Sequence, residues 1–96
     1  MDNFYLIDLY DIYGNLLTKK QQQYFEDYYF DNLSLQEISE NYNVSRNAIY
    51  NSLRETKEKL VLYESNLKIH KKNIKLKEIV TEIKDERIKK QLEELI

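Results

Sequence analysis

The fold is decided by residues 34–50, which read SLQEISENYNVSRNAIY. Ser34 and Glu37 have the spacing of a capping box, in which each side chain bonds a free amide at the start of a helix. The helix that follows should turn three apolar side chains inward, at Leu35, Ile38 and Tyr42. Ser45 is a good cap for a second helix, which leaves a tight turn at Asn43 and Val44. Two helices joined by about three residues predict a helix-turn-helix.

A second capping box lies upstream, at Thr18 and Gln21, and predicts another helix. Its inward face should hold aromatic side chains, namely Tyr24, Phe25, Tyr28 and Tyr29. Asn32 can end this helix because asparagine tolerates a positive φ. Before it, we expect a first helix that is capped by Asn3 and ends near Tyr13. Gly14 should close that helix in the left-handed conformation.

Downstream of the turn, Ile49, Leu53 and Leu60 share one helical face. The helical pattern continues to about residue 84, with a bend allowed at residues 65–66 or at Asn73. Asp85 can then cap a last helix. The sequence therefore predicts an all-α protein with one domain, residues 1–96. Its helix-turn-helix core should span about residues 18–60 and a long C-terminal helical extension about residues 61–96.

Composition narrows the class of protein. A chain of 96 residues without cysteine excludes disulfides and thiolate metal sites. No apolar run approaches the roughly 20 residues of a membrane span, and Met1-Asp2-Asn3 lacks the basic start of a signal peptide. We therefore expect a cytoplasmic protein. The lone histidine, His70, lies among lysines and should be solvated. Paired carboxylates such as Glu78 and Glu82 lack a cleft and a partner base, so we expect no catalytic residue, metal or cofactor.

The net charge of −2 is unevenly distributed. Residues 1–44 hold two lysines and eight acids, a charge of −6, whereas residues 45–96 hold thirteen basic and nine acidic residues, a charge of +4. An anionic partner should therefore meet the second half of the chain.

Three short motifs resemble the promoter-reading module of bacterial sigma factors: LTKKQ (residues 17–21), SLQEIS (residues 34–39) and VSRNAI (residues 44–49). Ser39 stands where that module usually has alanine. A resemblance to the YlxM-type family covers more of the chain, through its tyrosine-rich first helix, the run YYFD (residues 28–31) and SRNAIYN (residues 45–51) before a long charged helix. It implies an all-α homodimer with a regulatory or accessory role in the signal recognition particle pathway, and its RNA or protein as a partner.

Two surfaces are candidates for binding DNA or RNA. In a helix-turn-helix, the start of the second helix enters the major groove. Its outward face here should show Arg46, Asn47, Tyr50, Asn51 and Arg54, with Lys57 beyond them. Arginine can pair with guanine, and asparagine with adenine, through two hydrogen bonds. The alternative is a solvated face on a scaffold that no longer binds DNA, because Glu37, Glu40, Glu55 and Glu58 interrupt the basic character.

The second candidate surface is rich in lysine. Four of its side chains should share a helical face and could contact phosphates: Lys68, Lys71, Lys72 and Lys75. The stretch lacks aromatic residues, so it would recognise shape or charge and not base sequence. The alternative is an exposed lysine-rich helix without a partner.

Three functions remain open for this non-enzymatic chain. It could be an accessory protein that binds nucleic acid in the targeting pathway. It could instead be a sequence-specific transcription regulator that reads DNA with the start of its second helix. A protein-interaction scaffold that has lost nucleic-acid binding is the third.

Overall fold

The computed structural model describes residues 3–96; Met1 and Asp2, which entered the signal-peptide argument, lie outside the described part. The described chain forms helices and no strand, which confirms the all-α prediction. The helices are α1 (Asn3–Tyr13), α2 (Lys19–Tyr29), α3 (Leu35–Tyr42), α4 (Arg46–Leu67), α5 (Ile69–Val80) and α6 (Glu86–Glu93). A short 3-10 turn, Gly14–Leu16, follows α1. Asn3, expected as a cap, is already within α1.

The helix-turn-helix forms as predicted, because its local signals act together. At the start of α3, the Ser34 hydroxyl accepts from the Glu37 amide while the Glu37 carboxylate accepts from the Ser34 amide. Asn43 ends α3 in the left-handed region, with φ 55°. Ser45 then caps α4 by accepting from the Ala48 amide at 3.0 Å. The predicted capping box at the start of α2 is present too.

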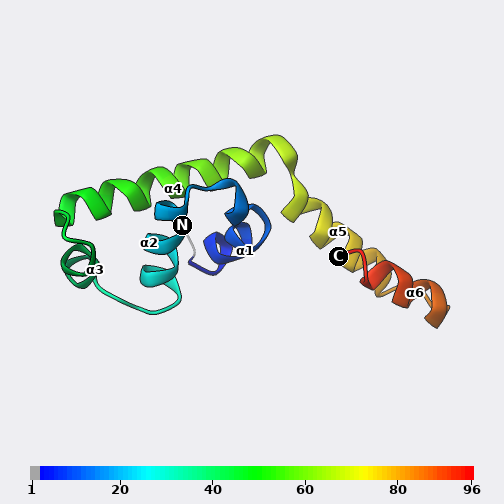
Figure 1. Cartoon of the computed structure of the whole chain (residues 1–96). Helices are drawn as coiled ribbons and strands as arrows, with labels where there is room; N and C mark the ends of the chain where they lie inside the picture. Colours follow the sequence, from blue (N-terminus) through cyan, green and yellow to red (C-terminus); the bar gives the residue numbers. More distant parts are fainter. Residues whose placement is uncertain (1–2) are drawn as a thin grey trace.

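Helix α4 is the longest helix of the described chain, and α1, α2 and α3 all pack along it (Figure 1). One buried cluster joins α1 and α2 to the C-terminal half of α4: Leu6, Leu9, Tyr13, Leu17, Phe25 and Leu60. A second joins α2 and α3 to the start of α4: Tyr24, Ile38, Ile49 and Leu53. The second cluster is the one that the helix-turn-helix pattern predicts.

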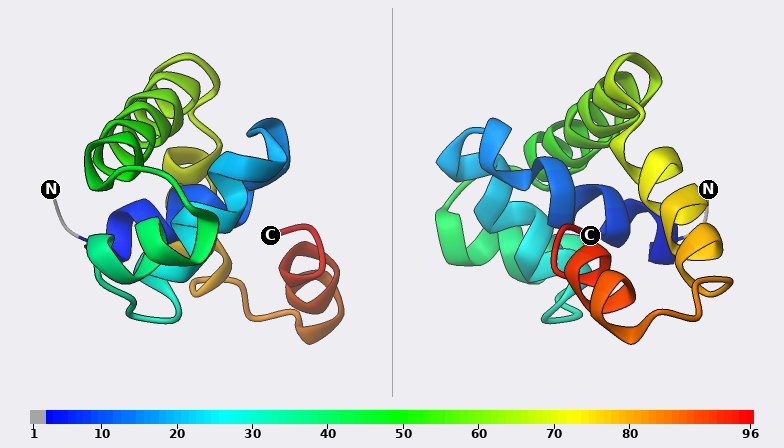
Figure 2. Two further views of the ribbon diagram at one scale, coloured as in Figure 1. Left: turned by 60° about the vertical axis from the view of Figure 1, so that its left-hand side comes forward. Right: turned by 90° about the vertical axis from the view of Figure 1, so that its right-hand side faces the viewer.

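Helices α5 and α6 extend from the end of α4 as an arm, which we define as residues 69–96 (Figures 1 and 2). The arm makes the molecule elongated, with extents of 55 × 25 × 22 Å. Helix α5 contacts α1 and α4, and α6 folds back on α5 after its predicted cap, Asp85. No residue of α6 is buried.

The prediction for Gly14 was wrong. Gly14 does not have a positive φ but lies in the 3-10 turn. The need for glycine comes from the Tyr10 ring, since a Cβ on Gly14 would lie 3.1 Å from it. That ring is held in place by stacking on Phe25, at 4.3 Å between centroids, and by donating its hydroxyl to Glu26.

The helix predicted beyond residue 46 is interrupted at a position that the sequence did not indicate. Neither residues 65–66 nor Asn73 breaks it; instead Lys68 takes the left-handed conformation, with φ 57°, and separates α4 from α5. Helix α5 ends at Val80, before residue 84. Lysine has no local preference for this conformation, so the break depends on tertiary contacts around it.

Candidate nucleic-acid interface

The start of α4 presents its polar side chains on one face. Arg46, Asn47, Tyr50, Asn51 and Arg54 are exposed, and Lys57 is half-buried. The opposite face of the same helix holds the buried residues Ile49, Leu53 and Thr56. Burial of this apolar stripe against α2 and α3 fixes the rotation of α4 and turns the polar face outward.

Acidic groups lie beside this polar face. Arg54 Nε lies 4.0 Å from Glu58 Oε1 within α4, and both side chains are more than half exposed. An exposed ion pair of this kind contributes little to the stability of the fold, so Arg54 can leave Glu58 and contact a partner. In α3, hydrogen bonds from the Ser34 amide and hydroxyl lower the pKa of Glu37 below its usual value. Glu37 and Glu40 are exposed, and α3 contains no basic residue.

The lysine surface lies at the other end of α4. Lys71, Lys72 and Lys75 are exposed and share the outward face of α5, but Lys68 is the junction residue and is not part of that helix. A helix of 22 residues such as α4 is about 33 Å long. The structure therefore separates the two candidate surfaces and does not join them into one patch.

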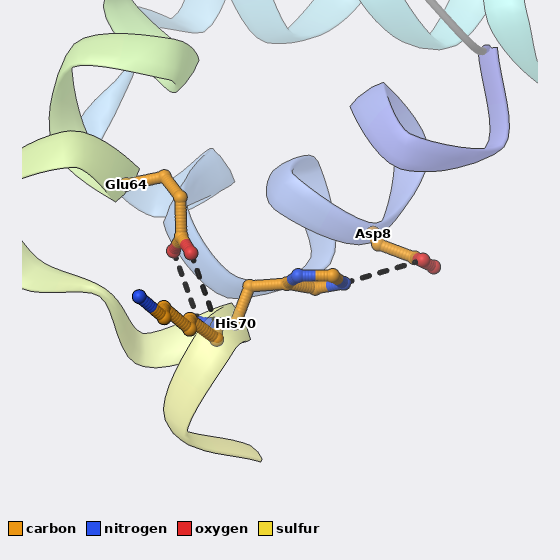
Figure 3. A network of polar contacts seen from close by, with 4 residues as sticks. Asp8, Glu64 and His70 are labelled. Atoms are coloured by element: carbon orange, nitrogen blue, oxygen red, sulfur yellow. Dashed lines mark hydrogen bonds and ion pairs between the residues drawn. The ribbon is translucent and has the colours of Figure 1, made fainter. Parts of the chain in front are cut away.

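Glu64 organises the junction between α4 and α5, a role that sequence reasoning missed (Figure 3). Its carboxylate is buried and accepts hydrogen bonds from the His70 and Lys71 amides, each at 3.0 Å. The Tyr13 hydroxyl of α1 donates to the same carboxylate at 2.7 Å and accepts from the Ile69 amide at 3.1 Å. Three free amides at the start of α5 are thus satisfied from two other helices.

The charge of Glu64 is stabilised where it lies. Burial raises the pKa of this carboxyl, but the hydrogen bonds from Tyr13, His70 and Lys71 outweigh it, so the pKa falls below its usual value. Burial and the hydrogen bond to Glu64 raise the pKa of Tyr13. Glu64 is therefore the anionic cap of α5, supplied from the preceding helix.

The expectation that His70 is solvated was wrong. His70 is half-buried, with its ring edge-on to Tyr5 at 5.4 Å between centroids and its Nε2 at 3.5 Å from Asp8 (Figure 3). The break at Lys68 redirects α5 so that His70 faces α1. Tyr28, expected to be buried, is also exposed, at 37%.

Residues 3–96 hold no group of three or more histidine, cysteine, aspartate or glutamate side chains that could bind a metal ion. None of the helices in that range is long and apolar enough to cross a membrane.

Comparisons with known proteins agree with this geometry. The model of the helix-turn-helix family UPF0122, described as YlxM / p13 like, matches residues 1–96. A UPF0122 protein of Malacoplasma penetrans is 51% identical over 85 residues, which cover 88% of this chain and 78% of the relative. One of Ureaplasma urealyticum is 44% identical over 96% of this chain and 93% of its own length. One of Bacillus velezensis is 44% identical over 80% of this chain and 70% of its own. With the helix-turn-helix in place, the chain belongs to the YlxM/p13-like UPF0122 family.

Proposed function

We propose that this protein is a non-enzymatic, cytoplasmic regulatory or accessory protein that binds nucleic acid with the outward face of α4. One observation carries the proposal: Arg46, Asn47, Tyr50, Asn51 and Arg54 lie exposed together at the start of the second helix of a helix-turn-helix. That position is the one through which such motifs contact the major groove of DNA. Lys57 extends the face, and the arm lysines Lys71, Lys72 and Lys75, with Lys68 at the junction, would add phosphate contacts.

The nucleic acid we propose is the RNA of the signal recognition particle, with its protein component as a further partner. This assignment rests on the resemblance to YlxM-type proteins. The test is a fluorescence anisotropy titration with that RNA and with a shuffled RNA of equal length, at physiological salt. Tighter binding to the particle RNA supports the assignment, and equal, weak binding to both contradicts it.

We also propose that the protein is a homodimer joined through the arm. Large apolar side chains stay exposed there: Ile74 at 47%, Ile79 at 46%, Ile88 at 41% and Leu95 at 77%. An amphipathic helix such as α6, with no buried residue, gains stability only when its apolar stripe is covered. Light scattering after size exclusion should give twice the monomer mass for the native chain and the monomer mass for the I79E/I88E variant.

A sequence-specific DNA regulator is the second candidate, because Arg46 and Asn47 are side chains that can read guanine and adenine. Selection from genomic DNA fragments should then return a shared motif that Asn47→Ala relaxes. Random recovered fragments would contradict this candidate. A scaffold without nucleic-acid binding predicts that the protein co-purifies with a targeting protein even after nuclease treatment.

A further inference from the structure

Two hollows adjoin on the surface beside the start of α4 and share Leu35 and Tyr50. The first lies between α2 and α4, and its lining includes Tyr28, Leu53, Arg54 and Lys57. The second is completed by Arg46 and Asn47. We call the combined surface the tyrosine groove.

The charged side chains that line the tyrosine groove are all basic. Arg46, Arg54 and Lys57 line it, and none of the residues that line either hollow is acidic. Glu55 and Glu58, which are close to Arg54 and Lys57 in the chain, are exposed and line neither hollow. In a chain with 17 acidic residues, a lining of this kind fits an anionic partner.

The groove also offers aromatic faces. Tyr50 is 54% exposed and Tyr28 is 37% exposed, although tyrosine rings gain stability from burial. The ring of Tyr28 lies edge-on to Tyr29, at 5.0 Å and 78°, which holds its orientation. Leu35 and Leu53 give the space between the rings an apolar floor. Exposed aromatic rings beside cations are the combination that binds unpaired bases by stacking and their phosphates by charge.

The neighbouring helix disfavours a duplex. When a helix-turn-helix docks in the major groove, its first helix crosses the sugar–phosphate backbone. That helix here is α3, which exposes Glu37 and Glu40 and has no basic residue to contact phosphates. Neither carboxylate lines the tyrosine groove, and Glu37 lines the adjoining hollow, which shares Tyr28 with the groove. A single strand confined to the groove therefore does not pass over them.

We propose that the tyrosine groove binds an unpaired stretch of single-stranded nucleic acid. One base stacks on Tyr50, a neighbouring base meets Tyr28, and Arg46, Arg54 and Lys57 contact the flanking phosphates. The inference rests on the proposed function, that the α4 face binds nucleic acid, and specifies the form of nucleic acid that this face accepts.

The test uses the full chain and three labelled probes: an oligouridylate, the matching oligothymidylate, and a duplex hairpin of equal nucleotide number whose strands are joined by a polyethylene glycol linker, so that it has no unpaired base. Each is titrated against the native protein, Tyr50→Leu, Tyr50→Phe and the control Phe30→Leu. Phe30 is a similarly exposed aromatic residue, at 48%, outside the lining of the groove. Tyr50→Leu should weaken single-strand binding about 5- to 100-fold. Tyr50→Phe, which keeps the ring, and Phe30→Leu should stay within about twofold.

The outcomes separate this inference from the proposed function. Stronger binding of either single strand than of the hairpin, lost in Tyr50→Leu and kept in Tyr50→Phe, supports the groove. A preference for the oligouridylate over the oligothymidylate would indicate that the groove also contacts the RNA sugar or base. Tighter binding of the hairpin, with no effect of Tyr50→Leu, overturns the groove but leaves α4 as a nucleic-acid surface. Binding of none of these probes, nor of the particle RNA, overturns both. Circular dichroism melting of each variant confirms that it is folded.

Discussion

At the scale of single residues, Glu64 connects the arm to the rest of the molecule. It is a buried carboxylate whose partners are a tyrosine hydroxyl and backbone amides. Its two oxygens accept from Tyr13, His70 and Lys71, which belong to α1 and to the first turn of α5. These hydrogen bonds stabilise the buried charge. If the carboxylate oxygens are removed, the amides that donate to them are left without a partner.

Replacing Glu64 by glutamine keeps the size of the side chain but removes the charge and turns one acceptor into a donor that faces an amide. We expect Glu64→Gln to lower the free energy of unfolding by about 2 kcal/mol, as measured by urea denaturation. Hydrogen exchange should speed up first at the amides of residues 69–71. Glu58→Gln is the matched control, since Glu58 is exposed and its ion pair is weak, and its stability should change by less than about 0.5 kcal/mol.

The same carboxylate predicts a dependence on pH. The pKa of Glu64 in the folded protein lies below the ordinary value of 4.5, so folding favours its charged form. Its contribution to stability is therefore present above pH 4.5 and is lost as the pH falls through the folded-state pKa. The stability difference between the native chain and Glu64→Gln should be constant near neutral pH and shrink below pH 4.5. A difference that stays constant down to pH 3 would contradict the charged cap.

At the scale of elements, the turn between α3 and α4 depends on one left-handed residue. Asn43 has φ 55°, a conformation that costs a β-branched residue about 1–2 kcal/mol. Asn43→Val should therefore lower the melting temperature clearly, whereas Asn43→Gly should leave it unchanged or raise it. Asn41→Val, an exposed position inside α3, is the control for the change of residue type. If Asn43→Val and Asn41→Val lower the melting temperature equally, the left-handed turn is not the cause of the loss of stability.

At the scale of the whole molecule, residues 58–67 of α4 separate the tyrosine groove from the lysine surface of α5, a rise of about 15 Å along the helix. A nucleic acid that contacts both must span this distance, and its contacts with lysine should depend on salt. For K71Q/K72Q, we expect the plot of log affinity against log salt to flatten by about 1.4–1.8, the value for two lost phosphate contacts. The equally charged control K19Q/K20Q, at the start of α2, should keep the native slope. If both variants keep it, the arm does not contact nucleic acid.

Local sequence signals are sufficient to specify the helix-turn-helix and the orientation of its second helix. Capping boxes, a left-handed asparagine and an apolar stripe are local signals that span a few residues, and each specifies its own turn of helix. The outward face of α4 follows from the same stripe, so its exposed residues could be named before the structure.

Four features follow from the packing of the helices and not from local sequence: the break at Lys68, the partners of Glu64 and His70, the need for glycine at position 14, and the joining of Tyr28 with Tyr50 in one groove. Each of these depends on how the helices pack, through contacts such as Tyr13 with Glu64 and Ile69, or Phe25 with the Tyr10 ring beside Gly14. No local preference of lysine favours the left-handed turn; it persists because Glu64 of α4 and Tyr13 of α1 accept from the amides that the turn exposes.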